Sequence, residues 1–193
     1  MNHNLTILDL GNVLVKLHFD RFFKRTAEVS TRSLDEIRER FSNTEYKDQL
    51  ERGDITETEL FAWMVDWLRW PPERKDELIF FWCDIFSAAK GAPEAVQHFK
   101  ARGPVWILTD AVPSHIDFIR ERFPWALAVD RVLTSYERGM CKREPGGFAA
   151  IINEAKLPPE RILFYDDLQM NVDAARQVGI DARLFTGWET ILK

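Results

Sequence analysis

An apolar run close to the N-terminus, residues 5–15, is interrupted by a single carboxylate, Asp9. The apolar residues before Asp9 suit a buried central strand, and Gly11 then breaks the run. Asp9 therefore stands at the carboxyl end of the predicted strand, which is the edge where open α/β sheets bind ligands. The alternative is that Asp9 only begins a turn, and later parts of the chain decide between the two.

The segment that follows, residues 16–89, has the pattern of a small helical unit. Ser33 with Glu36, and Thr56 with Glu59, have the spacing of capping boxes. In a capping box a hydroxyl and a carboxylate satisfy free N–H groups of the first helical turn. These pairs predict two helix starts, and we expect the whole segment to be helical.

One of these helices carries a stripe of large apolar side chains. Trp63, Trp67 and Trp70 fall at i, i+4 and i+7, with Leu60 and Met64 beside them on the same face. Such a stripe is typical of core packing rather than of a ligand-binding surface. We expect these residues to pack inside the helical unit.

From residue 90 onward, short apolar runs alternate with amphipathic segments. The predicted strands are residues 105–108, 126–133, 161–165 and 182–185, and the predicted helices are residues 93–100, 113–122, 148–155 and 171–178. Strands separated by helices indicate βαβ units and a parallel sheet. The predicted fold is α/β: a Rossmann-like parallel-sheet core formed by residues 1–15 and 90–193, with a small all-helical cap, residues 16–89, inserted after the first strand.

The composition limits the classes of function. The 193 residues can form one well-cored domain with an insert. The net charge of −5, from 26 basic and 31 acidic residues without runs of like charge, argues against nucleic-acid binding. Cys83 and Cys141 lack the spacing of a zinc site or a disulfide framework, so we expect a reducing, cytoplasmic location. No apolar run is long enough to span a membrane, and we expect a soluble chain.

Three predicted strands end in polar residues that should meet at one edge of the sheet: Asp9, residues 109–110 (Thr-Asp) and residues 166–167 (Asp-Asp). A carboxylate can attack phosphorus, a hydroxyl can donate to a phosphoryl oxygen, and paired carboxylates can bind a hard divalent cation. Lys142, in a loop before the last of these strands, supplies a positive charge. Phosphoryl transfer requires positioning and charge neutralisation, and this set of residues offers both.

Four short motifs, in this order, resemble those of the haloacid dehalogenase (HAD) superfamily of hydrolases. They are residues 9–13 (Asp-Leu-Gly-Asn-Val), 107–110 (Ile-Leu-Thr-Asp), 139–142 (Gly-Met-Cys-Lys) and 164–167 (Phe-Tyr-Asp-Asp), the last followed by Asn171. Together they span nearly the whole chain. The first motif, with an insert of this length directly after it, resembles the branch that includes α-D-glucose-1-phosphate phosphatases, and the insert corresponds to the helical cap of that branch.

The resemblance implies catalytic roles for three residues. Asp9 would attack phosphorus and form an aspartyl-phosphate. Thr109 and Lys142 would hold the phosphoryl oxygens of the substrate, and Lys142 would also orient Asp9. The implied substrate is a small phosphorylated metabolite such as a sugar phosphate.

The resemblance also implies a magnesium ion. Asp9, the backbone carbonyl of Gly11 and Asp166 would bind Mg²⁺, and Asp167 would support the ion or Lys142 from beside it. Asn171 would not bind the ion itself but would hold these ligands in place. Carboxylate and carbonyl oxygens are the donors that this hard cation prefers.

Gly11 departs from the pattern of the superfamily's phosphatases, most of which carry at this position a second aspartate that acts as general acid and base. Loss of a positioned acid typically costs about 10²–10⁴-fold in rate, so the release of a simple alkoxide should be slow. An anomeric sugar phosphate departs more readily because its leaving hydroxyl is more acidic. Gly11 therefore favours that type of substrate.

Four other positions are unusual for the resemblance. Lys16 and His18 follow the first motif, and each is either a substrate contact or a residue of the cap hinge; His18 is alternatively a substitute acid. Asp110 is predicted among the substrate-binding residues, although it adds negative charge near the phosphate. Cys141, beside Lys142, is either a thiol of lowered pKa or a tolerated substitution.

Two other functions stay open on the sequence alone. A haloacid dehalogenase would use Asp9 to displace halide from carbon without a metal, although the acidic pair at residues 166–167 favours magnesium. A catalytically weak relative would bind a phosphorylated ligand or a protein partner, and Gly11, Asp110 and Arg143 keep this alternative open. The sequence does not decide between a monomer and a dimer.

Overall fold

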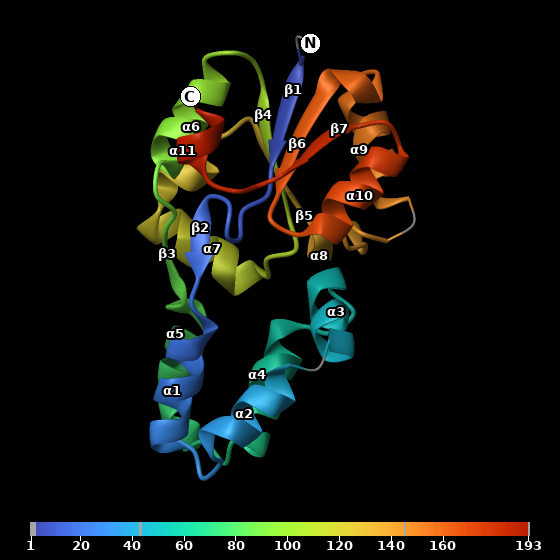
Figure 1. The fold of residues 1–193 in the computed structure, drawn as a ribbon. Helices are drawn as coiled ribbons and strands as arrows, with labels where there is room; N and C mark the ends of the chain where they lie inside the picture. The colour runs from blue at the N-terminus through green and yellow to red at the C-terminus, as the bar shows by residue number, and fades with distance from the viewer. Residues whose placement is uncertain (1–2, 43, 145, 193) are drawn as a thin grey trace.

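The computed structural model describes residues 3–42, 44–144 and 146–192 and places a sheet at one end of the molecule and a group of helices at the other (Figure 1). The sheet has the strand order β5-β4-β1-β6-β7. Its strands are β1 (Leu5–Leu8), β4 (Val105–Thr109), β5 (Arg131–Thr134), β6 (Ile162–Asp166) and β7 (Asp181–Leu184). All neighbouring strands run parallel. The predicted α/β fold with a Rossmann-like parallel sheet is confirmed.

Helices cover both faces of the sheet, and each face has its own apolar core (Figure 1). One face is covered by α6 (Ala92–Lys100), α7 (Pro113–Arg122) and α11 (Trp188–Ile191), and the other by α9 (Gly147–Ala155) and α10 (Gln169–Gln177). In β1, Leu8 joins the cluster of Phe99 and Trp188, whereas Ile7 joins the cluster of Phe148. Burial on both faces explains why β1 is apolar at successive positions.

Between β1 and α6 the chain forms a group of helices that we refer to as the cap helices. They are α1 (Phe19–Val29), α2 (Leu34–Phe41), α3 (Thr44–Arg52), α4 (Glu57–Trp67) and α5 (Lys75–Cys83). Both predicted capping boxes are present. The hydroxyl of Ser33 accepts from the N–H of Glu36, the hydroxyl of Thr56 accepts from the N–H of Glu59, and each glutamate carboxylate accepts from the N–H of its hydroxyl partner.

The prediction that residues 16–89 are helical throughout is wrong at both ends of the segment. β2 (Val15–Leu17) and β3 (Phe86–Ala88) form a two-stranded antiparallel sheet, through which the chain enters and leaves the cap helices. Three-residue strands are too short to show a period in the sequence. Because the two crossings are hydrogen-bonded to each other, the cap helices are joined to the sheet at one place.

The strand predicted for residues 126–133 also lies too far toward the N-terminus. A short 3₁₀ helix occupies Pro124–Leu127, and β5 begins only at Arg131. Proline at the first position favours such a helical turn. Other short elements are the 3₁₀ helices Pro72–Arg74 and Pro159–Arg161 and helix α8 (Ser135–Arg138). Within the described ranges, no helix combines the length and the apolarity that crossing a bilayer requires.

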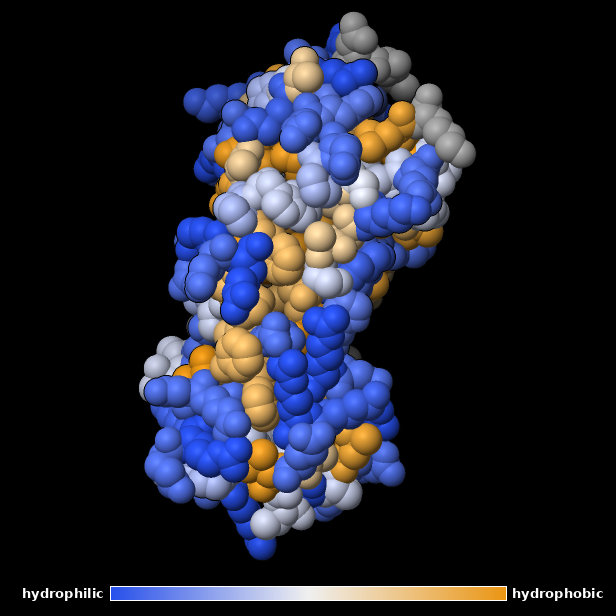
Figure 2. Space-filling model, turned by 90° about the vertical axis from the view of Figure 1, so that its left-hand side faces the viewer, coloured by the Kyte–Doolittle hydropathy of each residue, from blue (hydrophilic) through white to orange (hydrophobic). Residues whose placement is uncertain are grey.

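A single apolar core runs from the cap helices through the joint to one face of the sheet. Met64 in α4 and Phe86 in β3 belong to the same buried cluster as Leu8 in β1. Leu60 and Trp70, from the predicted stripe, are buried in it too, so these stripe residues pack as expected. Figure 2 shows apolar side chains that reach the surface along the waist between the two parts of the molecule. The cap helices are therefore packed against the sheet unit rather than loosely tethered to it.

His115 of α7 is buried in this joint. Its ring stacks on Trp82 of α5 with the centroids 4.9 Å apart, and it meets Phe86 of β3 edge-on at 5.0 Å. Its Nε2 lies 3.1 Å from the carbonyl oxygen of Trp82 and therefore donates to it. Burial lowers the pKa of His115 to about 4, against a smaller opposing effect of this hydrogen bond. The joint thus requires the neutral ring.

We predict that His115 makes the fold less stable in acid. The pKa of an unfolded histidine is about 6.5, which is above the folded value of about 4. The stabilising contribution is therefore present above pH 6.5 and is lost as the pH falls toward 4. Urea unfolding between pH 7 and 4 measures it, and His115→Gln should remove at most about 1.4 kcal/mol per pH unit from the slope.

His98→Gln, at a less buried histidine of α6, serves as the matched control and should change the slope less. Equal slopes for the wild-type protein and His115→Gln would contradict the assignment.

Candidate active site

The register of the sheet brings two of the predicted acidic residues together. Leu8 of β1 pairs with Tyr165 of β6 and with Ile107 of β4. Asp9 consequently follows β1 beside Asp166, and the N–H of Asp9 donates to the carbonyl of Tyr165 at 2.9 Å. Both carboxylates are buried, with 5% of Asp9 and 0% of Asp166 exposed.

Lys142 lies between these two carboxylates. Its Nζ donates to Oδ1 of Asp9 at 2.5 Å and to Oδ2 of Asp166 at 2.8 Å, and only 4% of the residue is exposed. Burial alone would lower the pKa of Lys142, but the neighbouring carboxylates raise it above its usual range. Lys142 is therefore a fixed positive charge, and its charge-assisted hydrogen bonds orient both acids.

Asp166 is held in place by two further groups. Its Oδ1 accepts from the N–H of Leu168 at 2.9 Å. The side-chain amide of Asn171 on α10 donates to Oδ1 at 3.0 Å and to Oδ2 at 3.1 Å. This arrangement leaves Oδ1 of Asn171 buried without a hydrogen-bond partner among the described residues. Buried acceptors are rarely left unpaired, so Asn171 offers an oxygen to a ligand of the site.

The site holds more negative than positive charge. Burial raises the pKa of Asp9 well above its usual range; Lys142 counteracts this, whereas Asp166 and Asp167 add to it. Three carboxylates thus share one ammonium group. A bound divalent cation would relieve the repulsion and favour the ionised form of Asp9.

The acidic residues fit a magnesium ion. Oxygens of Asp9, Asp166 and Asp167 all lie within 4.8 Å of one another, and Asn12 donates to Oδ2 of Asp167 at 3.0 Å. Gly11, whose carbonyl is a predicted ligand, lines the same cavity. A set of donors made only of oxygen suits Mg²⁺ better than zinc.

Thr109 lies at the end of β4, on the same edge of the sheet. Its Oγ1 accepts from the N–H of Ala111 at 3.1 Å, which leaves its hydroxyl hydrogen available to a ligand. Only 2% of Thr109 is exposed, yet it lines the cavity together with Lys142. A hydroxyl and an ammonium group can therefore donate to an anion beside Asp9.

Asp110, predicted as a substrate-binding residue, also fixes the loop that carries Lys142. Its Oδ1 accepts from the hydroxyl of Ser135 and from the backbone N–H of Lys142 at 3.4 Å. Arg143 forms an ion pair with its other oxygen at 3.9 Å. Although Asp110 lines the cavity, these partners offset the charge that it brings near a phosphate.

Lys16 and His18, the other predicted substrate contacts, are not among the residues that line the cavity. The Nζ of Lys16 donates to the carbonyl of Asn12 at 3.2 Å. Nε2 of His18 lies 2.7 Å from the hydroxyl of Ser87, and burial lowers the pKa of this histidine, with Arg21 and Lys16 adding to the effect. Both residues therefore belong to the joint between the cap helices and the sheet.

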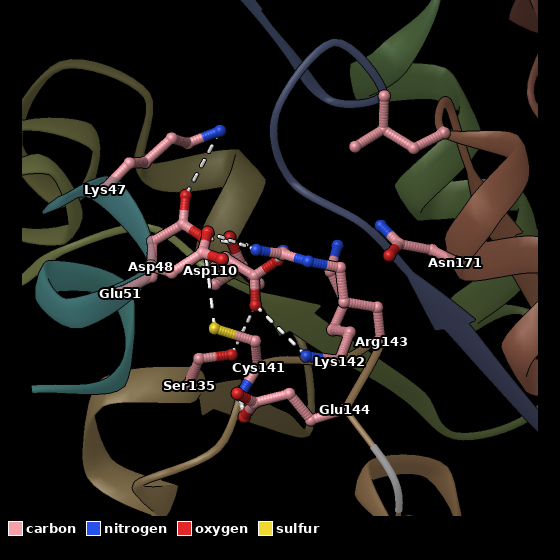
Figure 3. A network of polar contacts seen from close by, with 12 residues as sticks. Lys47, Asp48, Glu51, Asp110, Ser135, Cys141, Lys142, Arg143, Glu144 and Asn171 are labelled. Carbon is pink, nitrogen blue, oxygen red and sulfur yellow. Dashed lines mark hydrogen bonds and ion pairs between the residues drawn. The ribbon is translucent and has the colours of Figure 1, made fainter. Parts of the chain in front are cut away.

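Ion pairs connect cap helix α3 to the loop that carries Lys142, and we refer to them as the cap–core ion pairs (Figure 3). Arg143 pairs with Asp48, and with Glu51 at 3.7 Å. Arg52 of α3 donates to Glu144 at 2.7 Å. Sequence reasoning missed these contacts, since charged residues along a short helix are usually solvated and their partners are distant in the chain.

A cavity of about 740 Å³ opens above Asp9 and extends between the sheet and the cap helices. Asp9, Thr109 and Lys142 lie at its sheet end. Its cap end is lined by aromatic side chains, namely Phe19, Phe23, Phe41, Trp63, Trp82 and Phe86. Trp63 thus has a place in the cavity as well as in the predicted stripe. The other rings that line the cavity were not predicted from the sequence, although the i, i+4 spacing of Phe19 and Phe23 places these two side chains on the same helix face.

Residues 4–179 match the family described as haloacid dehalogenase-like hydrolases. This chain belongs to that family. The match includes Asp9, Thr109, Lys142 and Asp166, so the residues that form the site lie within it.

Solved structures share the fold of this hydrolase over nearly its whole length. A HAD family enzyme from Bacteroides thetaiotaomicron is 19% identical, with a TM-score of 0.89 and coverage of 100% of both chains. Its complex with magnesium and inorganic phosphate has a TM-score of 0.87 at 20% identity and covers 99% of this chain and 100% of that chain. A HAD-like family hydrolase from Porphyromonas gingivalis is 18% identical, with a TM-score of 0.81 and coverage of 97% and 93%.

One curated relative matches over a short stretch. The enolase-phosphatase E1 of Methylococcus capsulatus is 47% identical over 38 residues, which are 20% of this hydrolase and 17% of that relative. The hydrolase thus matches less than a fifth of that enzyme's length.

Cys141, beside Lys142, is not a reactive thiol in this hydrolase. Burial raises its pKa to about 12, and the nearby acids Asp110 and Glu51 add to the effect. Burial also raises the pKa of Cys83, to about 11. The alternative of a lowered thiol pKa at Cys141 is therefore wrong, because burial raises this pKa and the surrounding acids add to the effect.

We predict that both thiols of the folded hydrolase resist alkylation. At pH 8, iodoacetamide should modify Cys83 and Cys141 about 10²–10³-fold more slowly than a free cysteine with a pKa of about 8.5, because the reactive form is the thiolate. Peptide mass spectrometry measures the rate at each thiol. The same protein unfolded in guanidinium is the control, in which both should react quickly. Fast modification of Cys141 in the folded protein would contradict this assignment.

Proposed function

We propose that this hydrolase is a magnesium-dependent phosphatase that acts on a small phosphorylated metabolite through an aspartyl-phosphate on Asp9. The observation that carries the proposal is the buried ammonium of Lys142, which holds Asp9 at 2.5 Å and Asp166 at 2.8 Å. Thr109 lies at the same edge of the sheet. A carboxylate, a fixed cation and a hydroxyl donor are the parts that phosphoryl transfer needs.

Asp9 supplies the nucleophile. Lys142 holds Oδ1 of Asp9, so Oδ2 of Asp9 would form the bond to phosphorus. The bond from phosphorus to the ester oxygen breaks at the same time. The leaving oxygen takes the bonding electrons and then a proton from water. A second water molecule attacks phosphorus, releases inorganic phosphate and restores the Asp9 carboxylate. Thr109 and Lys142 stabilise the negative charge on the phosphoryl oxygens during both steps.

Asp9, Asp166 and Asp167 would hold the magnesium ion, and the unpaired Oδ1 of Asn171 supplies a further oxygen beside them. The ion would neutralise negative charge on the phosphate and on the carboxylates. The complex of the Bacteroides enzyme with magnesium and inorganic phosphate supports this proposal.

Among small phosphorylated metabolites, a sugar 1-phosphate is one candidate. The support is the resemblance of residues 9–13 to the branch that includes α-D-glucose-1-phosphate phosphatases. Gly11 agrees with it, because an anomeric hydroxyl is acidic enough to leave with little help from a proton donor.

Replacing Asp9 by asparagine should abolish the activity, since an amide cannot form the acyl phosphate. We expect a loss of more than about 10⁴-fold in phosphate release from acetyl phosphate and from a panel of phosphorylated metabolites with Mg²⁺. Asp76→Asn, at an exposed aspartate of α5, is the matched control and should keep full activity. Circular dichroism verifies that both variants fold.

Normal turnover by Asp9→Asn would rule out Asp9 as the nucleophile. Chloride release from 2-chloropropionate in the presence of EDTA would instead favour the dehalogenase alternative.

Magnesium should bind to the protein without substrate. Saturating Mg²⁺ at about 100 times its dissociation constant should stabilise the fold by about 2.7 kcal/mol, measured by chemical unfolding. Calorimetric titration should show binding at least about 10-fold weaker for Asp167→Asn. Asp173→Asn, at an exposed aspartate of α10, should bind Mg²⁺ like the wild-type protein. Equal affinity for both variants would exclude Asp167 as a ligand.

A further inference from the structure

The cavity above Asp9 changes in character from one end to the other. Its sheet end carries the groups proposed to bind phosphate. Its cap end carries the aromatic pocket, which we define as Phe19, Phe23, Phe41, Trp63, Trp82 and Phe86. These rings also contact one another: Phe19 and Phe23 stack with centroids 6.2 Å apart, and Phe41 lies 5.7 Å from Trp63. The organic group of the substrate, to which the phosphate is attached, must therefore lie in the aromatic pocket.

Several polar groups near the aromatic pocket already have partners, whereas Nε1 of Trp82 is buried without a hydrogen-bond partner among the described residues. Glu51 pairs with Lys47 at 3.3 Å. The guanidinium of Arg40 lies over the ring of Trp63 at 5.1 Å, and His115 donates to a backbone carbonyl. A sugar in the pocket would bury several hydroxyls, and the indole N–H of Trp82 could bond only one of them, so burying the others against aromatic rings would be unfavourable. An apolar ring would instead gain from burial and from contact with other rings.

Position 11, next to the nucleophile, carries no acid because it is a glycine. The Cβ of a side chain at Gly11 would lie 4.0 Å from Oδ2 of Asp9 and 3.1 Å from a methyl group of Leu17, so this position faces the nucleophile and is left without a functional group. Asp167 is engaged by Asn12. Neither Gly11 nor Asp167 therefore supplies a proton to the leaving oxygen, which favours a leaving group that is stable as an anion.

We infer, on the basis of the proposed phosphatase function, that the substrate is an aryl phosphate, a monoester whose aromatic ring occupies the aromatic pocket and whose leaving group is a phenolate. Asp9 forms the new bond to phosphorus, the bond from phosphorus to the phenolic oxygen breaks, and the phenolate leaves with the electron pair and is protonated by water. Phenols have a pKa of about 10, whereas alkyl alcohols resemble water at about 16. The aromatic pocket and the lack of an acid at Gly11 thus both favour aryl phosphates.

A set of four monoesters, assayed with Mg²⁺, separates the two parts of this inference. Phenyl and benzyl phosphate share an apolar ring but differ in the basicity of the leaving oxygen, and phenyl phosphate should have a kcat/KM at least about 10²-fold higher. Benzyl and ethyl phosphate share an alkoxide leaving group, and benzyl phosphate should be favoured about 10-fold or more by burial of its ring. Glucose 1-phosphate should be a poorer substrate than phenyl phosphate.

Substitutions at Gly11 test the missing acid. Gly11→Asp should raise the ratio of kcat/KM for benzyl phosphate to kcat/KM for phenyl phosphate at least about 10-fold, because only the alkoxide needs a proton. Gly11→Asn has the same shape without the acid and should leave this ratio as in the wild-type protein. Leu17 is the residue that must move slightly to admit either side chain. Equal effects of the two variants would overturn the assignment of a missing acid.

Substitutions in the pocket test where the ring binds. Phe23→Asn should weaken the binding of phenylphosphonate, which is not hydrolysed, about 10-fold, and leave methylphosphonate binding unchanged; Phe23→Leu should retain most of the preference. Phe80→Asn, at a 44% exposed phenylalanine of α5 outside the cavity, is the matched control and should bind both like the wild-type protein. If phenylphosphonate and methylphosphonate bind the wild-type protein equally, the aromatic pocket does not hold the substrate.

Acetyl phosphate separates failure of this inference from failure of the proposed function, because its leaving group needs neither the ring nor an acid. Turnover of acetyl phosphate combined with a preference for glucose 1-phosphate over phenyl phosphate would overturn the aryl phosphate assignment and leave the phosphatase intact. Absence of turnover for every ester and for acetyl phosphate would overturn both.

Discussion

The buried contact of Lys142 with Asp9 and Asp166 is the interaction on which the rest of the site depends. Two carboxylates at a buried sheet edge repel each other, and burial disfavours the ionised form of Asp9. The ammonium group counteracts this effect at Asp9 and fixes the direction of both carboxylates. Asp110 and the cap–core ion pairs support this contact, because they hold in place the loop that carries Lys142. The chain thus stabilises a nucleophile through contacts between segments far apart in the sequence.

The sheet end of the molecule could be predicted from the sequence because its signals are local. An apolar strand that ends in a carboxylate places that residue at the edge of a parallel sheet, and the register of β1 with β6 then brings Asp9 beside Asp166. Capping boxes are likewise short-range patterns, and both were correctly placed. Lys142 follows no strand, and only the order of four motifs linked it to the site.

The cap end could not be predicted in the same way, because its features depend on packing between helices. The strands β2 and β3 have three residues each, and only their pairing defines them. Trp63 follows a pattern typical of a core residue, yet its ring lines the cavity. Lys16 and His18 follow the first motif directly, but the chain turns into β2 there and carries them to the joint. In these cases the direction in which a side chain points, rather than its residue type, decides whether it lines the cavity.

The cap–core ion pairs and the paired strands β2 and β3 attach the cap helices to the sheet unit by different kinds of contact. The charged groups of Arg52, Glu144, Arg143 and Asp48 are partly exposed, and such pairs contribute only about 0.2–1 kcal/mol each. The contact of α3 with the loop that carries Lys142 therefore contributes little free energy and weakens as the salt concentration rises. The contact at the paired strands β2 and β3 includes the buried rings around His115, and apolar packing of this kind is not screened by salt. Ionic strength thus acts on one of the two attachments of the cap helices and leaves the other in place.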